Sequence, residues 1–324
     1  FFFHPHPGTR DPLWSRGLGD VYKRQVLSGK AKFGIFGDGK ELPQIAMAKV
    51  FDKGDFRSGY YRDQTFMFAI NKLTVKQFFS GLYANTSFEE EPMSGGRQMG
   101  SHFSSVFVDN KGDFIDLTKQ YNISSDISPT SGQMPRLLGL AMASKHFRSG
   151  KFNSNKLSNN GNEIAWGTIG NASTSEGLFF ETVNAIGVHQ VPAVISIWDD
   201  DYGISVDNSY QTTKSSISEA LKGFQRTKTE KGFEILTVNG WDYPSLISTY
   251  ENANNIARNE HVPVIIHVTE LTQPVGHSTS GSHERYKSKD RLEWEKSYDC
   301  NIKMKECILE NELFTSKELD KFYD

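Results

Sequence analysis

The sequence predicts an α/β protein built on a doubly wound, mostly parallel sheet with helices on both faces. The first observation is a strand, loop, helix, strand and loop that follow one another between Ile164 and Ser205. The second is that Phe233–Val238 and Val262–Val268 are further strand-like runs, separated by a helical segment that extends through Ala257. Strands that alternate with helices in this way are typical of a parallel sheet covered on both sides.

The composition limits both size and partners. With 324 residues, of which 37% are hydrophobic, the chain is long enough for one large α/β domain or two small ones. The formal net charge of −3 gives no indication of a nucleic-acid partner. No run approaches the roughly 18 apolar residues that a membrane span requires, and Phe1–Pro5 lacks the features of a signal peptide. We therefore expect a cytoplasmic protein without a nucleic-acid or membrane partner.

The two ends of the chain differ from the rest. Phe1–Gln25 has Pro, Gly and Arg scattered without a period and resembles translated sequencing-adapter sequence, so we interpret it as a non-native segment. Glu318–Asp324 stops partway through a helical pattern without a cap. We expect one domain over residues 26–324, truncated at both ends.

The central unit carries polar groups at the ends of its strands. Ser173–Glu176, after the first strand, is a helix-start signal of hydroxyls followed by a carboxylate. Val191–Ile197 is a buried-strand run of mainly β-branched residues. Because the loops after two parallel strands emerge at the same edge of a sheet, we expect Asn171 and Asp200 to be neighbours in space.

These two loops offer oxygen atoms of the kinds that magnesium prefers. The amide of Asn171, the carboxylate of Asp200 and a loop carbonyl lie beside a helix N-terminus, which itself attracts phosphate. Magnesium takes few ligands from protein and the rest from water and from phosphates. The pattern therefore predicts a site for a magnesium diphosphate.

Gly170–Gly177 and Asp199–Ser205 resemble the thiamine diphosphate motif of the 2-oxo acid dehydrogenases, in the α subunit of the decarboxylating component. That motif usually reads Gly-Asp-Gly-Ala-x-Ser-Glu-Gly and then Asn-Asn-x-Tyr-x-Ile-Ser. The resemblance implies a thiamine diphosphate-binding fold with cofactor contacts and metal ligands in both loops. The implied cofactor-binding residues here are Asn171, Ala172, Ser173, Asp200 and Tyr202; the implied metal ligands are Asn171, Asp200 and the Tyr202 carbonyl. Relative to the family, the acid and the amide have exchanged places.

Two earlier segments extend the resemblance. Arg62 beside Tyr61 combines a fork-shaped donor with a phenolic donor, which suits phosphate oxygens; it resembles the family's Tyr-Arg pair that holds the diphosphate. The family's loop against the thiamine pyrimidine corresponds to Ser128 and Thr130. By contrast, Gly37–Gly39 is not followed by a suitable crossover, and we predict a tight turn there.

Two loops resemble parts of the active-site mouth. Met93–Ser104 is similar to the Gly-Arg-Gln-Met-x-x-His segment of branched-chain members, which would put His102 near the mouth; a plain surface histidine is the alternative. Thr272–Tyr286 resembles the family's lid, and His277 would contact the diphosphate and help to position a lipoyl group as a catalytic residue. The lid departs from the family at Gln273, usually arginine, and at Gly281, usually aspartate.

The resemblance implies oxidative decarboxylation of a 2-oxo acid with acyl transfer to a lipoyl group, using thiamine diphosphate and magnesium. The partners would be a β-type subunit or domain and a lipoyl-bearing acyltransferase core, in a hetero-oligomer or a dimer of fused chains. Two loop motifs favour branched-chain acids. Acetoin cleavage, ketol transfer and a non-catalytic cofactor-binding role remain alternatives.

Overall fold

The fold is a six-stranded sheet in which every neighbouring pair of strands is parallel, as predicted. The computed structural model describes residues 21, 23–31, 33–153, 155–279 and 283–323. In the order β2-β1-β3-β4-β8-β7, the strands are Asn122–Ile123, Phe56–Ser58, Ala165–Gly170, Ala193–Trp198, Val264–Thr269 and Glu234–Asn239. A small antiparallel hairpin joins β5 (Tyr202–Gly203) to β6 (Val206–Asp207).

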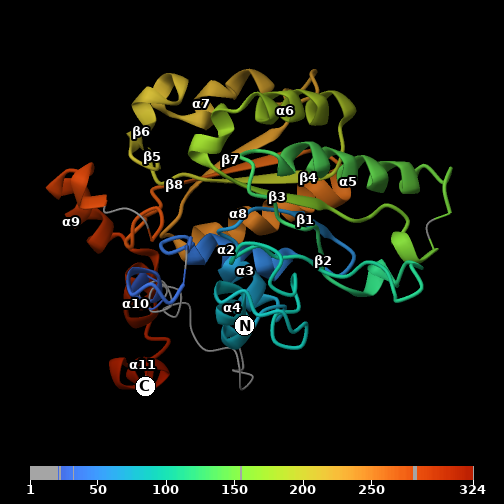
Figure 1. Ribbon diagram of the computed structural model, residues 1–324. Coiled ribbons are helices and arrows are strands. Elements are labelled where there is room, and N and C mark those ends of the chain that lie inside the picture. The colour runs from blue at the N-terminus through green and yellow to red at the C-terminus, as the bar shows by residue number, and fades with distance from the viewer. Residues whose placement is uncertain (1–20, 22, 32, 154, 280–282, 324) are drawn as a thin grey trace.

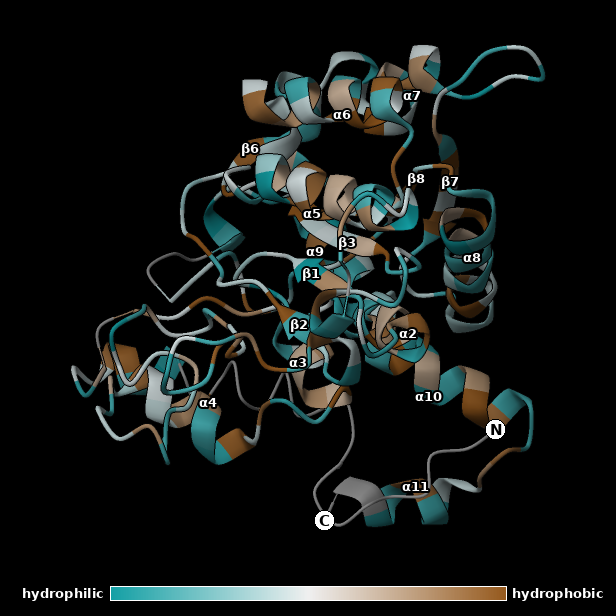
Figure 2. Cartoon of the chain, turned by 90° about the vertical axis from the view of Figure 1, so that its right-hand side faces the viewer, coloured by the Kyte–Doolittle hydropathy of each residue, from teal (hydrophilic) through white to brown (hydrophobic). Residues whose placement is uncertain are grey.

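Helices cover both faces of this sheet (Figure 1). One layer holds α5 (Gln133–Arg148), α6 (Gly177–His189) and α7 (Ile217–Ala220). The opposite layer holds α2 (Glu41–Val50), α3 (Gln64–Ala69), α4 (Val75–Leu82) and α8 (Tyr243–Asn255). Beside them lie α9 (Lys289–Ser297), α10 (Cys300–Glu310) and α11 (Ser316–Tyr323). Figure 2 shows the same layers from the side, with α5 and α6 above β3 and α2 and α3 below it.

The central strands are apolar on both faces because each face contacts its own core. All six residues of β4 are buried. Val194 and Trp198 belong to the core under α2 and α8, whereas Ile195 and Ile197 belong to the core under α5 and α6. A strand buried on both sides has no polar face, which explains why the sequence shows a continuous apolar run there.

The predicted helix start after β3 is wrong in detail. Asn171–Ser175 forms a separate 3-10 turn, and α6 begins only at Gly177, without a side-chain cap. The Thr174 hydroxyl instead donates to the Asn171 carbonyl at 2.6 Å. The Thr174 hydroxyl therefore closes the turn that carries Asn171, because local bonds to nearby backbone compete with helix capping.

The sheet has a topological switch point between β1 and β3. The chain continues from β1 to β2 on one side and from β3 to β4 on the other. Ligands of open α/β sheets bind at such a point, outside the carboxyl ends of the strands. Tyr61 and Arg62 follow β1, and Asn171 follows β3, so the predicted site residues lie at this edge.

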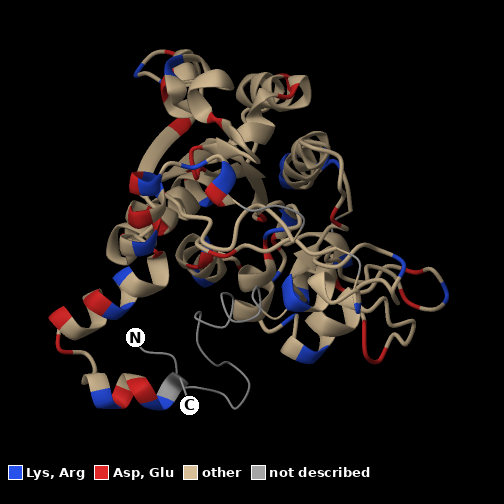
Figure 3. Ribbon diagram, turned by 60° about the vertical axis from the view of Figure 1, so that its left-hand side comes forward, with Lys and Arg blue, Asp and Glu red and all other residues tan. Residues whose placement is uncertain are grey.

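Figure 3 shows that positively and negatively charged residues are both distributed along the described chain. Within the same residues, no helix combines the length and the apolar character needed to cross a membrane. The predicted non-native segment lies mostly in residues 1–20, outside the described part.

Candidate functional site

Charged and polar side chains from distant segments meet at the switch-point edge. We call them the Lys40 cluster: Lys40, Arg62, Asp200, Gln273 and His277. The Nζ atom of Lys40 donates to Oδ2 of Asp200 at 2.8 Å, to Oε1 of Gln273 at 2.7 Å and to the Thr272 carbonyl at 3.1 Å. An ammonium has three N–H donors, so all three are used. Lys40 is only 2% exposed.

Gly37–Gly39 forms the predicted tight turn, and this turn directs Lys40 into the site. The Lys40 amide donates to the Gly37 carbonyl at 3.0 Å. Gly39 has a φ of +77°, and a Cβ there would lie 2.3 Å from the Thr272 carbonyl oxygen. Only glycine allows this approach. Sequence reasoning predicted the turn but missed the lysine that follows it.

The Lys40–Asp200 pair is a buried ion pair. Burial alone would raise the pKa of Asp200, but the charges of Lys40 and Lys287 outweigh it and lower that pKa to about 2. Burial lowers the pKa of Lys40 below its ordinary value, and Asp200 opposes that change. The carboxylate therefore carries its charge throughout the physiological range.

The loop that holds Asp200 is fixed from two sides. Asp199 accepts from Nε2 of His267 on β8 at 2.9 Å, and its other oxygen accepts from the Asp201 amide at 2.9 Å. Arg291 donates to the Asp200 carbonyl at 2.8 Å and to the Asp201 carboxylate at 2.5 Å. His267 and Arg291 are positioning residues that the sequence did not single out.

Arg62 joins the end of β1 to the predicted lid. Its guanidinium donates to Nδ1 of His277 at 2.9 Å, to the His277 carbonyl at 3.1 Å and to the Phe36 carbonyl. Its carbon atom Cζ also lies 5.6 Å from the centre of the Tyr61 ring. Because Arg62 can only donate, Nδ1 of His277 is an acceptor and Nε2 carries the ring proton.

The predicted loop residues meet as expected at the same edge. Gly170 pairs with Trp198 across β3 and β4, so the turns carrying Asn171 and Asp200 are neighbours. A Cβ on Gly203 would lie 2.6 Å from the Ala172 side chain, which shows how closely the two turns pack.

Ser173 and Tyr202 are held by neighbouring groups. The Ser173 carbonyl accepts from Ser131, a residue that sequence reasoning missed. The Tyr202 amide donates to Oδ1 of Asp200 at 3.3 Å. The Tyr202 ring lies 5.1 Å from the Lys287 ammonium. The bond to Asp200 places Tyr202 beside the Lys40 cluster, whereas the bond from Ser131 ties Ser173 to the segment before α5.

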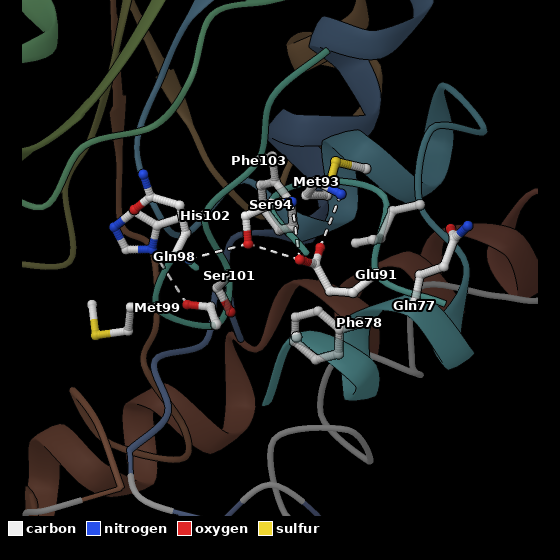
Figure 4. A pocket seen from close by; sticks show the side chains of 13 residues that line it. Gln77, Phe78, Glu91, Met93, Ser94, Gln98, Met99, Ser101, His102 and Phe103 are labelled. Atoms are coloured by element: carbon white, nitrogen blue, oxygen red, sulfur yellow. Dashed lines mark hydrogen bonds between the residues drawn. The ribbon is translucent and has the colours of Figure 1, made fainter. Parts of the chain in front are cut away.

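His102 is not a plain surface histidine, since it is only 5% exposed. Its Nε2 atom lies 2.9 Å from the Ser128 hydroxyl, which ties the Met93–Ser104 loop to the loop after β2. Figure 4 shows the pocket that His102 and Glu91 both line; the Glu91 carboxylate accepts bonds from Met93, Ser94 and Gly96 and so shapes this loop. Ser128 and Thr130 are exposed.

Several buried donors at this edge have no partner within the described part of the chain. They are the Tyr60 hydroxyl, Nδ2 of Asn171 and Nε2 of Gln273. Lys40 holds the amide oxygen of Gln273, which leaves its nitrogen as the free donor. Unsatisfied buried donors cost about 1–3 kcal/mol each, so they fit a ligand rich in acceptor oxygens, such as a diphosphate.

The predicted magnesium ligands fit their ion less well. Both carboxylate oxygens of Asp200 are engaged, Oδ2 by Lys40 and Oδ1 by the Tyr202 amide. Among the described residues, no three or more His, Cys, Asp or Glu side chains are grouped to hold a metal ion. A magnesium ion would therefore compete with these bonds for Asp200, and the assignment of Asn171, Asp200 and Tyr202 as magnesium ligands stays a prediction.

The family model described as "Dehydrogenase E1 component" matches residues 20–324. The chain belongs to this family. The E1 family resemblance drawn from the sequence motifs is thereby confirmed, and thiamine diphosphate is the cofactor that this family implies. Residues 280–282, which include the predicted departure at Gly281, lie outside the described residues.

Three relatives illustrate where this E1 chain belongs. It is 27% identical to the 2-oxoisovalerate dehydrogenase subunit alpha of Bacillus subtilis over 84% of this chain and 72% of the relative. It is 24% identical to the mitochondrial subunit alpha 2 of Arabidopsis thaliana over 86% of this chain. It is 23% identical to the mitochondrial subunit alpha of Homo sapiens over 85% of this chain. The chain spans 51% and 54% of those two mitochondrial relatives.

Proposed function

We propose that this chain is the α part of a thiamine diphosphate-dependent 2-oxo acid dehydrogenase, which decarboxylates a 2-oxo acid and passes the acyl group to a lipoyl arm. The observation that carries the proposal is the Arg62–His277 bond, which lies at the switch point of an E1 family chain. Around it, the unpaired donors of Tyr60, Asn171 and Gln273 suit the diphosphate of the cofactor.

In this proposal, bound thiamine diphosphate supplies the nucleophilic carbon and accepts the electrons released on decarboxylation. Arg62 binds the diphosphate and holds His277 in place. Nε2 of His277, which carries the ring proton, donates to the diphosphate or to the incoming lipoyl group. Ser128 and Thr130 present their backbone to the pyrimidine. The chain therefore binds and orients the cofactor.

The proposed partners are a β-type subunit or domain that completes the site and a lipoyl-bearing acyltransferase core. Exposed apolar side chains on the outer side of α6 support a partner of this kind: Leu178 and Phe180 are each 41% exposed and Val188 is 68% exposed. By contrast, Leu137 and Ala141 of α5 are fully buried within the chain's own core. A cytoplasmic location stays a prediction.

The relatives named 2-oxoisovalerate dehydrogenase favour a branched-chain 2-oxo acid as substrate. The test is reduction of an artificial electron acceptor by the assembled complex with thiamine diphosphate and a panel of 2-oxo acids. We expect 2-oxoisovalerate to be oxidised with a higher kcat/KM than pyruvate. A complex that binds the cofactor but oxidises no 2-oxo acid, and instead cleaves acetoin or transfers a ketol group, would overturn the proposal. As a control, the complex with the exposed variant Lys49→Met should oxidise the same 2-oxo acids with an unchanged kcat/KM.

A further inference from the structure

We propose that the ammonium of Lys40 occupies the oxygen ligands that a divalent cation would otherwise need, so that this chain holds thiamine diphosphate without magnesium. The inference rests on the proposed function, because it concerns the same diphosphate site. It starts from the atoms around Nζ of Lys40, which are a carboxylate oxygen of Asp200, the carbonyl of Thr272 and the amide oxygen of Gln273.

The oxygens around Lys40 belong to the classes that a magnesium site uses. A carboxylate, an amide oxygen and a backbone carbonyl are the ligand types predicted from Asn171, Asp200 and Tyr202. Here such a set surrounds a nitrogen at 2.7–3.1 Å, which is the length of hydrogen bonds. Magnesium requires about 2.0–2.1 Å. The three oxygens are therefore engaged by an ammonium.

The departures from the family pattern fit this arrangement together. Asp200 replaces an amide and supplies the charge that balances Lys40. Gln273 replaces an arginine, and its amide accepts the bond that a guanidinium could not. The two substitutions are far apart in the sequence but contact the same ammonium. A single cause, the lysine at position 40, explains both.

The local field also opposes a divalent ion. Lys40, Lys287 and Arg62 all carry positive charges that act on Asp200. Lys287 is itself paired with Glu295 at 2.6 Å. An ion beside Asp200 would meet the Lys40 ammonium at close range, and like charges repel. A diphosphate, in contrast, is attracted by the same groups.

The experiment measures thiamine diphosphate binding to the assembled complex by calorimetry, after removal of divalent metals with EDTA and again with excess magnesium. Losing a residue that only hydrogen-bonds to a metal ligand typically weakens metal affinity about 10- to 100-fold. We therefore take a change of about tenfold in the dissociation constant as the smallest change that indicates a bound metal. We expect the dissociation constant in EDTA to be less than about tenfold weaker than with magnesium. A larger loss would overturn the inference and leave the proposed function intact. No binding under either condition would overturn both.

Variants make the test specific to Lys40. Lys40→Met should weaken binding in EDTA by about tenfold or more, whereas the exposed Lys49→Met in α2, the helix that follows Lys40, should not. Because Lys40→Met leaves a buried carboxylate unpaired and can impair folding, a triple variant is the second measurement. Lys40→Met with Asn171→Asp and Asp200→Asn restores the family's acid and amide without the ammonium. Its binding should become magnesium-dependent; equal binding with and without magnesium would contradict the role of Lys40.

Discussion

The guanidinium of Arg62 lies 2.9 Å from Nδ1 of His277, although the two residues are 215 positions apart in the sequence. The bond connects the end of β1 to the segment after β8 and fixes the tautomer of the histidine. It also couples Arg62, which the sequence assigned to diphosphate binding, to His277, which it assigned to both diphosphate binding and catalysis. Changes at either residue should therefore affect the other.

Arg62→Ala should weaken thiamine diphosphate binding. A charge-assisted hydrogen bond contributes roughly 1.5–3 kcal/mol, which corresponds to about 10- to 150-fold at 1.4 kcal/mol per decade. Calorimetric titration of the assembled complex measures the change, with the exposed Lys49→Met as the control. An unchanged dissociation constant would refute the role of Arg62.

His277 should stay neutral well into the acidic range. Burial and the charge of Arg62 lower the pKa of His277 to about 3, whereas an unfolded histidine titrates near 6.5. Below about pH 6.5, the unfolded chain therefore binds a proton at His277 that the folded chain does not bind. The free energy of unfolding should keep this contribution above about pH 6.5 and lose it as the pH falls from 6.5 towards 3.

The titration can be followed by NMR of the histidine rings, with the His277 signal assigned from His277→Gln. We expect no transition near neutral pH. Arg62→Ala removes one of the causes and should move the midpoint upward. A midpoint near 6.5 in the unaltered chain would contradict the buried, arginine-bonded histidine.

Lys40 and Asp200 should be strongly coupled in stability. Removing one partner of a buried ion pair costs about 3–5 kcal/mol because the other charge is left uncompensated. Lys40→Met and Asp200→Asn should each show such a loss, and the double variant should lose much less than the sum. Urea denaturation of the four proteins measures the cycle. Simple additivity would mean that the two side chains do not interact.

Long apolar runs explain which strands the sequence could predict. The strands β3, β4, β7 and β8 each span six residues, and their predicted positions are confirmed within a few residues. The strands β1 and β2 have only three and two residues, too short for a hydrophobic pattern to identify. Neighbouring positions for Asn171 and Asp200 could be predicted because parallel strands bring their loops to one edge.

Lys40 could not be predicted in the same way. Its contact with Asp200 spans 160 positions, and nothing local distinguishes a buried lysine from a solvated one. The available signal was indirect. Relative to the family, Asp200 adds a negative charge and Gln273 removes the positive charge of an arginine, so both changes leave a negative charge that a nearby cation would balance. Without the fold, many lysines could supply it. Ser131, His267 and Arg291 were missed for the same reason, since their roles depend on tertiary contacts.

The central claim is that this chain supplies the diphosphate half of a thiamine-dependent decarboxylating enzyme whose site is completed by a β-type partner. The most direct measurement is carbon dioxide release from carboxyl-labelled 2-oxoisovalerate, with thiamine diphosphate, by the isolated chain and by the chain with its partner. We predict release by the assembled complex and none above background by the isolated chain. Equal release by the isolated chain, or no release by an assembled complex that binds the cofactor, would contradict the claim.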